Sequence, residues 1–583
     1  MCGLWAFINL KGKNLKMAEL YQDFWQLQHR GPDNSYFETY KNVIIGFHRL
    51  AIIDDTFVSN QPFVIEDDTR TVVFVCNGEI YNYKEIATKY NLSTLHGIAS
   101  DCYVIPQAYM TMSKYFTDND FNRFVKEDIK GEFAFMLFEF DRLKNLRKVI
   151  VARDEIGIRP LYYSPDTVDT LLFSSEIKGC LSHKNTKISE FPPGNVYTYT
   201  IDELVNVTLK RYDFKTVYDQ PVDYMNSYVP ETIRLNMIQK SVLNSVRRRL
   251  SADKPFAFLL SGGVDSSLVA GLSAKILGKP IRTFCCGIAA GAYSVDGGAS
   301  FTTGEGTDMK FARRVAEHIG STHTDVFFTP QEGVDAIPDV IRTIESWDTT
   351  SVRASVGQYL VSKWIGTNTD CKVVMVGEGP DEVCSSYLFN WYAPSGEELN
   401  KCAVDYVKNI HYYDVKRADR CISRWGLEGR VPLLDPEFIE TYWKIPAERR
   451  MPTYKNMEKW WLREAFQGVG VLPGEVLWRK KEAFSDGVSA GEKSWFQIIQ
   501  DWVSSRVSNE EMAGAAEKYP YCTPATKEAY YYRKIFCNIF GEERQTVIPG
   551  YWQPKWTADG KEITEYIDPS ARVLDVYSED LDV

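Results

Sequence analysis

The chain has 583 residues and a formal net charge of −11 at pH 7, with 44% hydrophobic and 25% charged residues. This length exceeds what a single hydrophobic core supports, so two or more domains are expected. The acidic balance argues against a general nucleic-acid-binding protein, which needs a basic surface, although a local basic pocket for a phosphate ligand stays open. Twelve cysteines without a CxxC pair, no apolar run of membrane length and no secretory signal predict a cytoplasmic protein without membrane partners.

The first ~200 residues contain short β-rich runs and few helical patterns, judged by periodicity. One helix is expected at 17–31, where Leu20, Phe24 and Leu27 recur at helical spacing. So many strands in so short a span imply two packed sheets. The predicted strands are 4–10, 42–53, 71–78, 131–141, 148–154, 171–177 and 195–201.

The second half alternates strand and helix patterns. This alternation predicts a doubly wound parallel sheet, in which ligands bind beyond the carboxyl ends of the strands. The predicted helices are 231–250, 266–277, 309–320 and 331–345, the last broken or kinked at Pro338. The predicted strands are 255–260, 281–288, 322–329 and 371–379.

Changes in composition suggest the domain boundaries. We expect a first domain at 1–205, a polar, Tyr-rich linker at 206–230 and a second domain at 231–545. The remainder, 546–583, is expected to be a solvated terminal tail. Residues 289–307 are rich in Gly, Ala, Ser and Thr without an apolar period, and we interpret them as a long mobile loop after a strand end.

A cysteine stands directly behind the initiator methionine in MCGLWAF. The ordinary interpretation is a small apolar residue at the start of a strand, and position alone favours it. The alternative is catalytic, since removal of Met1 would leave Cys2 with a free α-amino group beside its own thiol. A nucleophile and its base would then share one residue.

The stretch LLSGGVDSSLVAG (259–271) is the strongest local signal in the chain. An apolar strand runs into Ser-Gly-Gly, and a helix follows at Asp265. The two glycines let the backbone approach a ligand closely, and the free N–H groups of a helix N-terminus favour an anion. A plain strand–turn–helix with a polar cap explains SGG alone but not the whole string SGGVDSS. No GxxxxGK[ST] motif is present, so this is not a Walker A loop.

A second polar cluster follows the strand in VVMVGEGPDEV (373–383). Glu378, Asp381 and Glu382 lie just past the strand end, where clustered carboxylates could hold Mg²⁺ or orient an amine. A solvated acidic loop would account for any one of them taken singly.

SGGVDSS resembles the pyrophosphate-binding loop of N-type ATP pyrophosphatases, which split ATP between the α- and β-phosphates and adenylate an oxygen of the substrate. Taken together, nearly the whole chain resembles the glutamine-hydrolysing asparagine synthetase family. The matching motifs of the first half are MCG, HRGPD (29–33), HRLAIID (48–54), NGEIYN (77–82), SDCYVI (100–105) and IGIRPLYY (156–163). Those of the second half are SGGVDSS, IESWDTTSVRAS (344–355), GEGPDEV, YYDVKRADR (412–420), LEGRVPLLD (427–435), WRKKEAFSDGV (478–488) and TKEAYYYR (526–533).

This resemblance implies an N-terminal Ntn-hydrolase αββα sandwich and a C-terminal doubly wound α/β domain with the phosphate loop. In the first domain Cys2 would attack the glutamine side-chain amide to form a thioester, with its own α-amino group as the base. Asn77 and the N–H of Gly78 resemble the oxyanion hole. Arg49 would clamp the glutamine α-carboxylate, and Asp101 and Glu79 would hold the α-amino group.

In the second domain the resemblance implies ATP and Mg²⁺, with glutamine and aspartate as the other small-molecule substrates. The implied ATP-binding residues are Leu259, Ser261, Gly262, Gly263, Asp265, Ser266, Gly377 and Glu378. Asp265 and Asp381 are the candidates for Mg²⁺, and Glu378 resembles the general base that accepts a proton as ammonia attacks. Lys481, with Lys480 as the alternative, resembles the lysine that steadies the phosphate during adenylation. Asp414 and Arg417 would contact aspartate or the phosphates, and a channel would carry ammonia between the domains.

The sequence departs from the family pattern at three places. Pro380 stands where Ser is common, with Cys384-Ser385-Ser386 in place of Phe-Gly-Gly. Gly429 replaces the usual Ala, and 289–307 is longer than the family's segment. These changes leave three alternatives: a β-lactam-synthetase-like enzyme on another carboxylate, an amidotransferase with another acceptor, and a catalytically inactive regulatory homologue. The sequence leaves the oligomeric state open, and a homodimer is one state it allows.

Overall fold

The computed structural model describes residues 1–12, 14–92, 99–112, 117–165, 169–184, 186–214, 229–480, 490–491 and 493–566. The chain forms two compact units. Unit 1 comprises Met1–Thr216, Ser251–Pro255 and Ser423–Glu428, and unit 2 comprises Val217–Leu250, Phe256–Ile422 and Gly429–Val583. Among the described residues, no helix is both long and apolar enough to cross a membrane.

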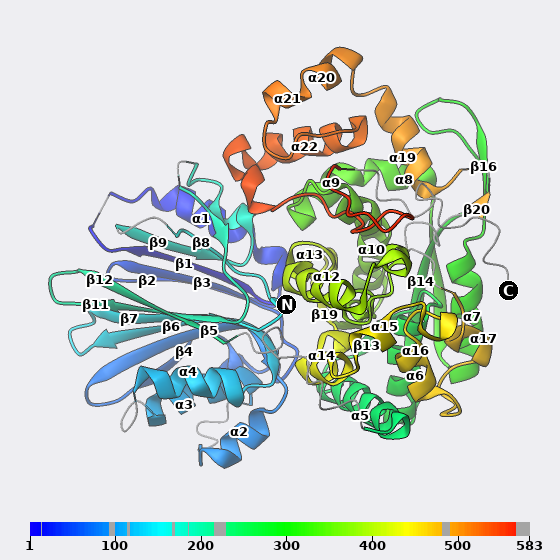
Figure 1. Ribbon diagram of the computed structural model, residues 1–583. Coiled ribbons are helices and arrows are strands. Elements are labelled where there is room, and N and C mark those ends of the chain that lie inside the picture. The colour runs from blue at the N-terminus through cyan, green and yellow to red at the C-terminus, as the bar shows by residue number, and fades with distance from the viewer. Residues whose placement is uncertain are drawn as a thin grey trace. The chain divides into compact units, whose positions relative to one another are not determined.

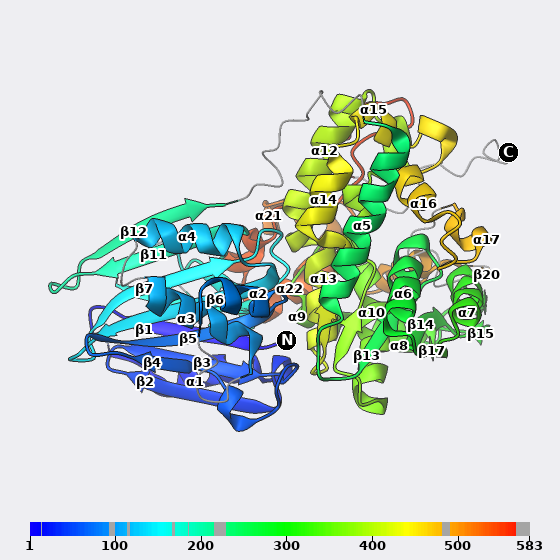
Figure 2. The ribbon, with the colours of Figure 1, turned by 90° about the horizontal axis from the view of Figure 1, so that it is seen from below.

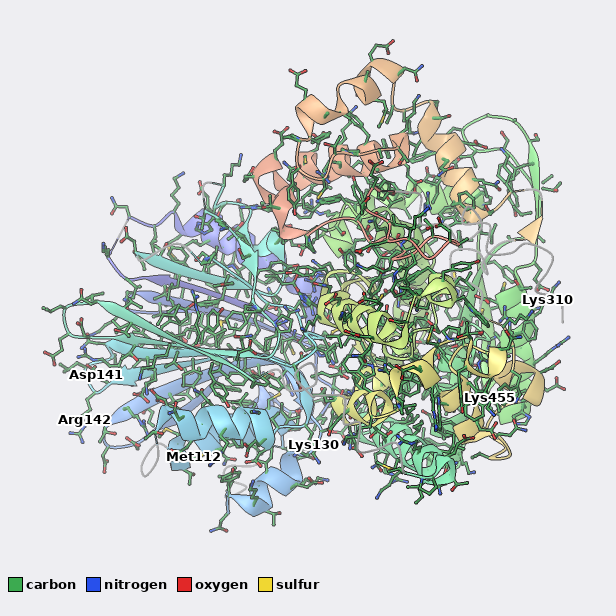
Figure 3. All side chains as sticks on the ribbon, viewed as in Figure 1. Met112, Lys130, Asp141, Arg142, Lys310 and Lys455 are labelled. Carbon is green, nitrogen blue, oxygen red and sulfur yellow. The ribbon has the colours of Figure 1, made fainter. Side chains whose placement is uncertain are left out.

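Unit 1 contains two six-stranded sheets, whose strand orders are β10-β8-β9-β1-β3-β2 and β12-β11-β7-β6-β5-β4. The first sheet is built from β1 (Gly3–Asn9), β2 (Asn34–Tyr40), β3 (Val43–Arg49), β8 (Tyr162–Tyr163), β9 (Thr170–Ser174) and β10 (Ser189–Glu190). The second is built from β4 (Phe63–Glu66), β5 (Arg70–Ile80), β6 (Gly131–Asp141), β7 (Leu146–Arg153), β11 (Asn195–Ile201) and β12 (Val207–Asp213). Figure 3 labels Asp141, the last residue of β6, and Lys130, the residue before its first.

The alternation of side chains along the strands assigns each face to a different core. Leu4, Ala6 and Ile8 of β1 pack with Val73 and Val75 of β5 in the core between the sheets. The other face of the second sheet is covered by α2 (Tyr83–Lys89), α3 (Val104–Met112) and α4 (Asp118–Glu127), and α1 (Met17–Trp25) lies on the outer face of the first (Figure 1). Unit 1 is therefore an αββα sandwich, which confirms the expected fold.

Unit 2 is organised around a five-stranded sheet of order β17-β14-β13-β18-β19. Its strands are β13 (Phe256–Leu259), β14 (Arg282–Ile288), β17 (Thr322–Phe328), β18 (Val373–Met375) and β19 (Glu428–Arg430). β13, β14, β17 and β18 run parallel. The chain leaves β13 towards β14 and later returns to place β18 on the other side of β13. The strand order therefore reverses between β13 and β18, and this is where doubly wound sheets bind ligands.

The helices of unit 2 cover this sheet, and α5 runs beside α14 and α16 (Figure 2). The helices up to the middle of the unit are α5 (Glu231–Arg249), α6 (Val264–Leu277), α7 (Thr307–Ile319), α8 (Pro330–Asp335), α9 (Ile337–Ile344), α10 (Thr349–Asn368), α11 (Pro380–Val383), α12 (Gly396–Asn409) and α13 (Asp414–Ser423). The remaining helices are α14 (Pro436–Trp443), α15 (Ala447–Arg450), α16 (Trp460–Phe466), α17 (Gly474–Leu477), α19 (Trp495–Ser504), α20 (Asn509–Ala513), α21 (Ala515–Lys518) and α22 (Lys527–Phe540). The predicted break at Pro338 is confirmed, since Pro338 lies in the first turn of α9.

Three segments differ from expectation. Residues 207–213 of the expected linker form β12, whose partly buried Val207 and Leu209 pack on the core between the sheets. Part of the expected loop 289–307 forms the hairpin β15 (Gly291–Tyr293) and β16 (Phe301–Gly304), and β16 pairs with β20 (Ala490–Gly491). In β16 only Phe301 and Thr303 are buried, on alternate positions, and this pattern is too short to indicate a strand among so many small residues.

The expected solvated tail is packed as far as it is described. The Trp552 N–H donates to Asp348 Oδ1 at 2.8 Å, and the Tyr551 and Trp347 rings lie 4.7 Å apart edge to face. Trp556 is 3% exposed. These aromatic side chains need burial, and together they tie residues 546–566 to unit 2.

Candidate active sites

Cys2 lies immediately before β1, where the ends of three strands of unit 1 meet. Its backbone N–H donates to Asn77 Oδ1 on β5 at 2.9 Å, and its carbonyl accepts from Arg30 Nε at 3.0 Å. The sulfur lies 3.5 Å from the N–H nitrogen of Leu50, the residue that follows β3. The structure thus brings Cys2 and Asn77, 75 positions apart in the sequence, into direct contact.

The thiol of Cys2 is in its protonated form at neutral pH. Burial raises its pKa to about 11, although the nearby chain-terminal ammonium and the contact with Leu50 act in the opposite direction. A protonated thiol is a weak nucleophile, so attack on an amide needs a base nearby. Catalysis at Cys2 therefore requires a base, and the expected base is the α-amino group of Cys2 itself.

The chain-terminal amine belongs to Met1 in this structure. Met1 is 1% exposed, and its ammonium donates to Leu427 O at 3.4 Å. Burial lowers the pKa of this amine to about 6, because the charged form loses its hydration. The nitrogen of Cys2 is a peptide nitrogen while Met1 is attached, so it cannot accept a proton in this form.

Asn77 has the geometry of an oxyanion-hole side chain. Its Oδ1 accepts from Cys2, which leaves the Nδ2 amino group to point elsewhere. Nδ2 is buried and has no hydrogen-bond partner among the residues that the structure describes. A buried donor without a partner costs about 1–3 kcal/mol, and an oxygen that develops negative charge nearby would satisfy it.

Arg49 ends β3 and is 6% exposed. Its Nη1 donates to Thr56 O at 2.9 Å and to Asn60 Oδ1 at 2.7 Å, and its Nη2 donates to Asp54 O. The guanidinium is close enough to Cys2 to lower the pKa of the thiol. Arg49 therefore holds the segment 54–60 against the site, in addition to the carboxylate-binding role expected of it.

The two acidic residues expected to hold the glutamine amino group are both buried. Glu79 lies near the end of β5, and Asp101 opens a 3-10 turn, Asp101–Tyr103. Asp101 Oδ2 accepts from the Ile80 N–H at 2.5 Å. The structure thus places both carboxylates beside the end of β5 that carries Asn77.

In unit 2 the segment SGGVDSS joins β13 to α6 as predicted. Gly262 has φ +72°, and a Cβ on it would lie 2.5 Å from the Phe311 side chain, so glycine is required there. Ser261 and Ser266 have their hydroxyls 3.0 Å apart. Gly263 caps α6, whose free N–H groups open towards the end of β13.

The end of β18 lies against the N-terminus of α6. A Cβ on Gly377 would lie 2.6 Å from the Ser266 nitrogen, so only glycine permits this close approach. The next residue, Glu378, has a raised pKa, mainly because of burial, and the Arg417 guanidinium 3.5 Å away opposes this shift. Arg417 also donates to Asp414. Glu378, Arg417 and Asp414 thus form one group of charged side chains.

Asp265 and Asp381 converge on one cation. Lys459 Nζ donates to Asp381 Oδ1 at 2.6 Å and to Asp265 Oδ2. Burial opposes the charge on Lys459, yet the two carboxylates more than offset it and raise the pKa of this lysine. These two carboxylates could hold Mg²⁺, since Mg²⁺ is usually held by one or two carboxylates and substrate phosphates.

A cavity of about 200 Å³ in unit 2 collects most of the predicted residues. Its walls include the side chains or backbone of Leu259, Ser261, Gly263, Asp265, Ser266, Gly377, Glu378, Asp381 and Arg417. Asp414 does not line the cavity, but it accepts a hydrogen bond from Arg417, which does. Gly262 belongs to the SGGVDSS loop, although it does not line the cavity itself. Although the chain is acidic overall, five cationic side chains face this cavity, namely Arg417, Lys459, Arg463, Arg479 and Lys480. Four acidic side chains, Asp265, Asp308, Glu378 and Asp381, also line it, so the cavity offers both cations for a polyphosphate and carboxylates for a metal ion.

Several residues of this cavity were not singled out from the sequence, among them Lys459, Arg479 and Gln358. Lys459 lies outside the quoted motifs. Arg479, which donates to Gly262 O at 3.2 Å, stands within WRKKEAF and could have been found there. Gln358 is buried on α10, a helix that was not predicted, and it stands outside the quoted motifs. Lys480 lines the cavity, whereas Lys481 lies outside the described residues.

The departures from the family pattern are accommodated locally. Pro380 occupies the first turn of α11, where a missing N–H breaks no helical hydrogen bond. Ser385 adopts φ +55°, and the Ser386 hydroxyl donates to Asp381 Oδ1 at 2.6 Å. The changed segment therefore still directs Asp381 to Lys459, and Gly429 is the buried central residue of β19.

Comparison with known proteins agrees with this arrangement. Residues 1–219 match the family Glutamine amidotransferase domain, and residues 237–404 and 392–564 match the family Asparagine synthase. The chain is 36% identical to asparagine synthetase [glutamine-hydrolyzing] of Gallus gallus, over 99% of both chains. The chain belongs to the glutamine-hydrolysing asparagine synthetase family. The synthetase of Homo sapiens is 35% identical, again over 99% of both chains.

Proposed function

We propose that this synthetase-family chain amidates aspartate to asparagine, with ATP as the energy source and ammonia from glutamine as the nitrogen donor. The observation that carries the proposal is the cavity of unit 2. There the SGGVDSS loop, two carboxylates that share a cation, and the partly buried Glu378 surround one space. These are the parts that ATP cleavage and an attack by ammonia require.

In unit 1 we propose that Met1 is removed and that the freed α-amino group of Cys2 takes the thiol proton. The thiolate attacks the amide carbon of glutamine, the α-ammonium returns the proton to the departing nitrogen, and ammonia leaves as a thioester forms. Water then hydrolyses the thioester, which releases glutamate and restores the thiol. Asn77 Nδ2, the buried donor described above, would stabilise the oxyanion together with the Gly78 N–H. Arg49 would bind the α-carboxylate, while Glu79 and Asp101 would bind the α-amino group.

In unit 2 an oxygen of the aspartate β-carboxylate attacks the α-phosphorus of ATP, and the bond to pyrophosphate breaks. The loop from Ser261 to Ser266 and the surrounding cations would hold the phosphates. Asp265 and Asp381 would hold Mg²⁺, which when bound neutralises phosphate charge. Lys459 would then move from the carboxylates towards the phosphates, and Lys480 or Lys481 would steady the α-phosphate.

The second half-reaction releases AMP. Ammonia attacks the acyl carbon of β-aspartyl-AMP, Glu378 accepts a proton from the added nitrogen, and AMP leaves. The raised pKa of Glu378 suits this role, because a base works best when its pKa lies near the operating pH. The Asp414–Arg417 pair would orient aspartate or the departing phosphates beside it.

All twelve cysteines are free thiols in the structure, which supports a cytoplasmic, reducing location for this enzyme. The proposed substrates are small molecules only.

The products of the complete reaction test the proposed function. With aspartate, MgATP and glutamine, we expect asparagine, AMP and pyrophosphate in equal amounts. ADP and phosphate would contradict the assignment of the ATP chemistry. If another carboxylate is amidated and aspartate is not, the proposed ATP chemistry stands but aspartate is not the acceptor.

A further inference from the structure

Gln358 bridges the two charged residues at the centre of the unit 2 cavity. It lies on α10 and is 2% exposed. Its Nε2 donates to Glu378 Oε1 at 3.2 Å, and its Oε1 accepts from Arg417 Nη1 at 3.3 Å. All three side chains line the cavity.

An amide is well suited to this position. A carboxylate can only accept hydrogen bonds and a guanidinium can only donate them, whereas glutamine does both at once. Arg417 Nη1 is 3.5 Å from Glu378 Oε1, beyond a good direct hydrogen bond. Gln358 therefore spans a gap that the ion pair alone leaves open.

The helix that carries Gln358 is held rigidly. Near its start, Arg353 forms a bidentate pair with Glu528 of α22, with distances of 2.8 and 2.6 Å. The Asp348 side chain caps α10 by accepting from the Ser351 N–H at 2.8 Å. A group on a rigid helix can fix its partners more accurately than one on a loop.

We propose that Gln358 is a positioning residue for the amidation step, which orients the Glu378 carboxylate and the Arg417 guanidinium for the attack of ammonia. This inference rests on the proposed role of Glu378 as the base. Gln358 does not touch the reacting atoms in this account. It is also not required for the adenylation step, in which Glu378 accepts no proton.

The groups that face Glu378 determine the pH dependence. Arg417 and the Gln358 amide lower its pKa, whereas burial and the Asp414 carboxylate raise it. The Cys421 thiol, also on α13, is uncharged because burial raises its pKa to about 12. Loss of the Gln358 donor removes one stabiliser of the carboxylate, so the pKa of Glu378 rises and the base is protonated up to a higher pH.

The Gln358→Met variant tests this role, because methionine keeps the volume and loses both hydrogen bonds. At a constant concentration of free ammonia, we expect the rate of asparagine formation to fall about tenfold, and its acid limb to move up by about one pH unit. Aspartate-dependent exchange between ATP and pyrophosphate should stay within about twofold, and glutamine hydrolysis should not change. Gln239→Met is the matched control, since Gln239 on α5 donates to Ala465 O, outside the cavity.

Gln358→Glu is the second variant and has almost the same size. It places a carboxylate beside Glu378, so the two compete for one proton and the acid limb should move further up than in Gln358→Met. An unmoved acid limb in both variants, or an exchange reaction that falls in parallel with amidation, would overturn the positioning role. If the wild-type protein itself lacks aspartate-dependent exchange, it is the proposed function that fails.

Discussion

Cys2→Ala should lose glutamine-dependent asparagine synthesis by at least ~10³-fold, because no other thiol can form the thioester. Its synthesis with added ammonium should stay within about twofold of the wild-type rate, since the unit 2 cavity contains no part of the Cys2 site. Both rates are measured as asparagine formed per unit time at saturating aspartate and MgATP.

The matched control is Cys102→Ala. Cys102 is a buried thiol whose sulfur lies 3.4 Å from Gly78 O, near the same strand end, but no role in catalysis is assigned to it. The Cys102→Ala variant should keep glutamine-dependent synthesis. A folding defect in this variant would also lower the ammonium-dependent rate, so the two rates together separate a folding effect from a catalytic one. The wild-type protein should begin at Cys2 by mass, since the base requires a free α-amino group there. Loss of both synthetic activities in Cys2→Ala would contradict the separation into two sites.

Glu378→Gln should lower amidation by about 10²–10⁴-fold while aspartate-dependent exchange between ATP and pyrophosphate persists. Glutamine keeps the size of the side chain but cannot accept the proton of the attacking ammonia. The acyl-adenylate should therefore form and accumulate on the variant. Rapid-quench measurement of bound AMP against released asparagine separates the two steps.

The control for this substitution is Glu382→Gln, in the same segment. Glu382 is buried, accepts from Tyr387 OH and does not line the cavity that holds Glu378. It should not cause accumulation of the acyl-adenylate. An equal fall in exchange and amidation in Glu378→Gln would contradict the role of Glu378 as the base. It would indicate instead that Glu378 contributes to ATP binding.

Much of the fold and of both sites could be predicted because their signals are local. The nearly continuous apolar runs of β5 and β6 and the strand–turn–helix at SGGVDSS are set by neighbouring residues. Helix α3 was not predicted, because it lacks such a local signal. Seven of its nine residues, VIPQAYMTM, are buried, so its sequence carries no polar face to reveal a helical period.

The residues missed in the cavity depend on contacts between distant segments. Lys459 meets Asp265 across 194 positions, and Gln358 meets Arg417 across 59. No local pattern of hydrophobic residues encodes such pairs. The Glu378 side chain was found from its place after a strand, but the network that tunes its pKa required the packed structure.

The account depends most on β-aspartyl-AMP as the intermediate. Aspartate labelled with ¹⁸O in its β-carboxylate tests this directly by mass spectrometry of the nucleotide and phosphate products. Attack on the α-phosphorus followed by displacement with ammonia predicts that AMP carries one ¹⁸O atom from aspartate. Label in inorganic phosphate, with ADP as the nucleotide, would contradict the acyl-adenylate and the function proposed for the unit 2 cavity.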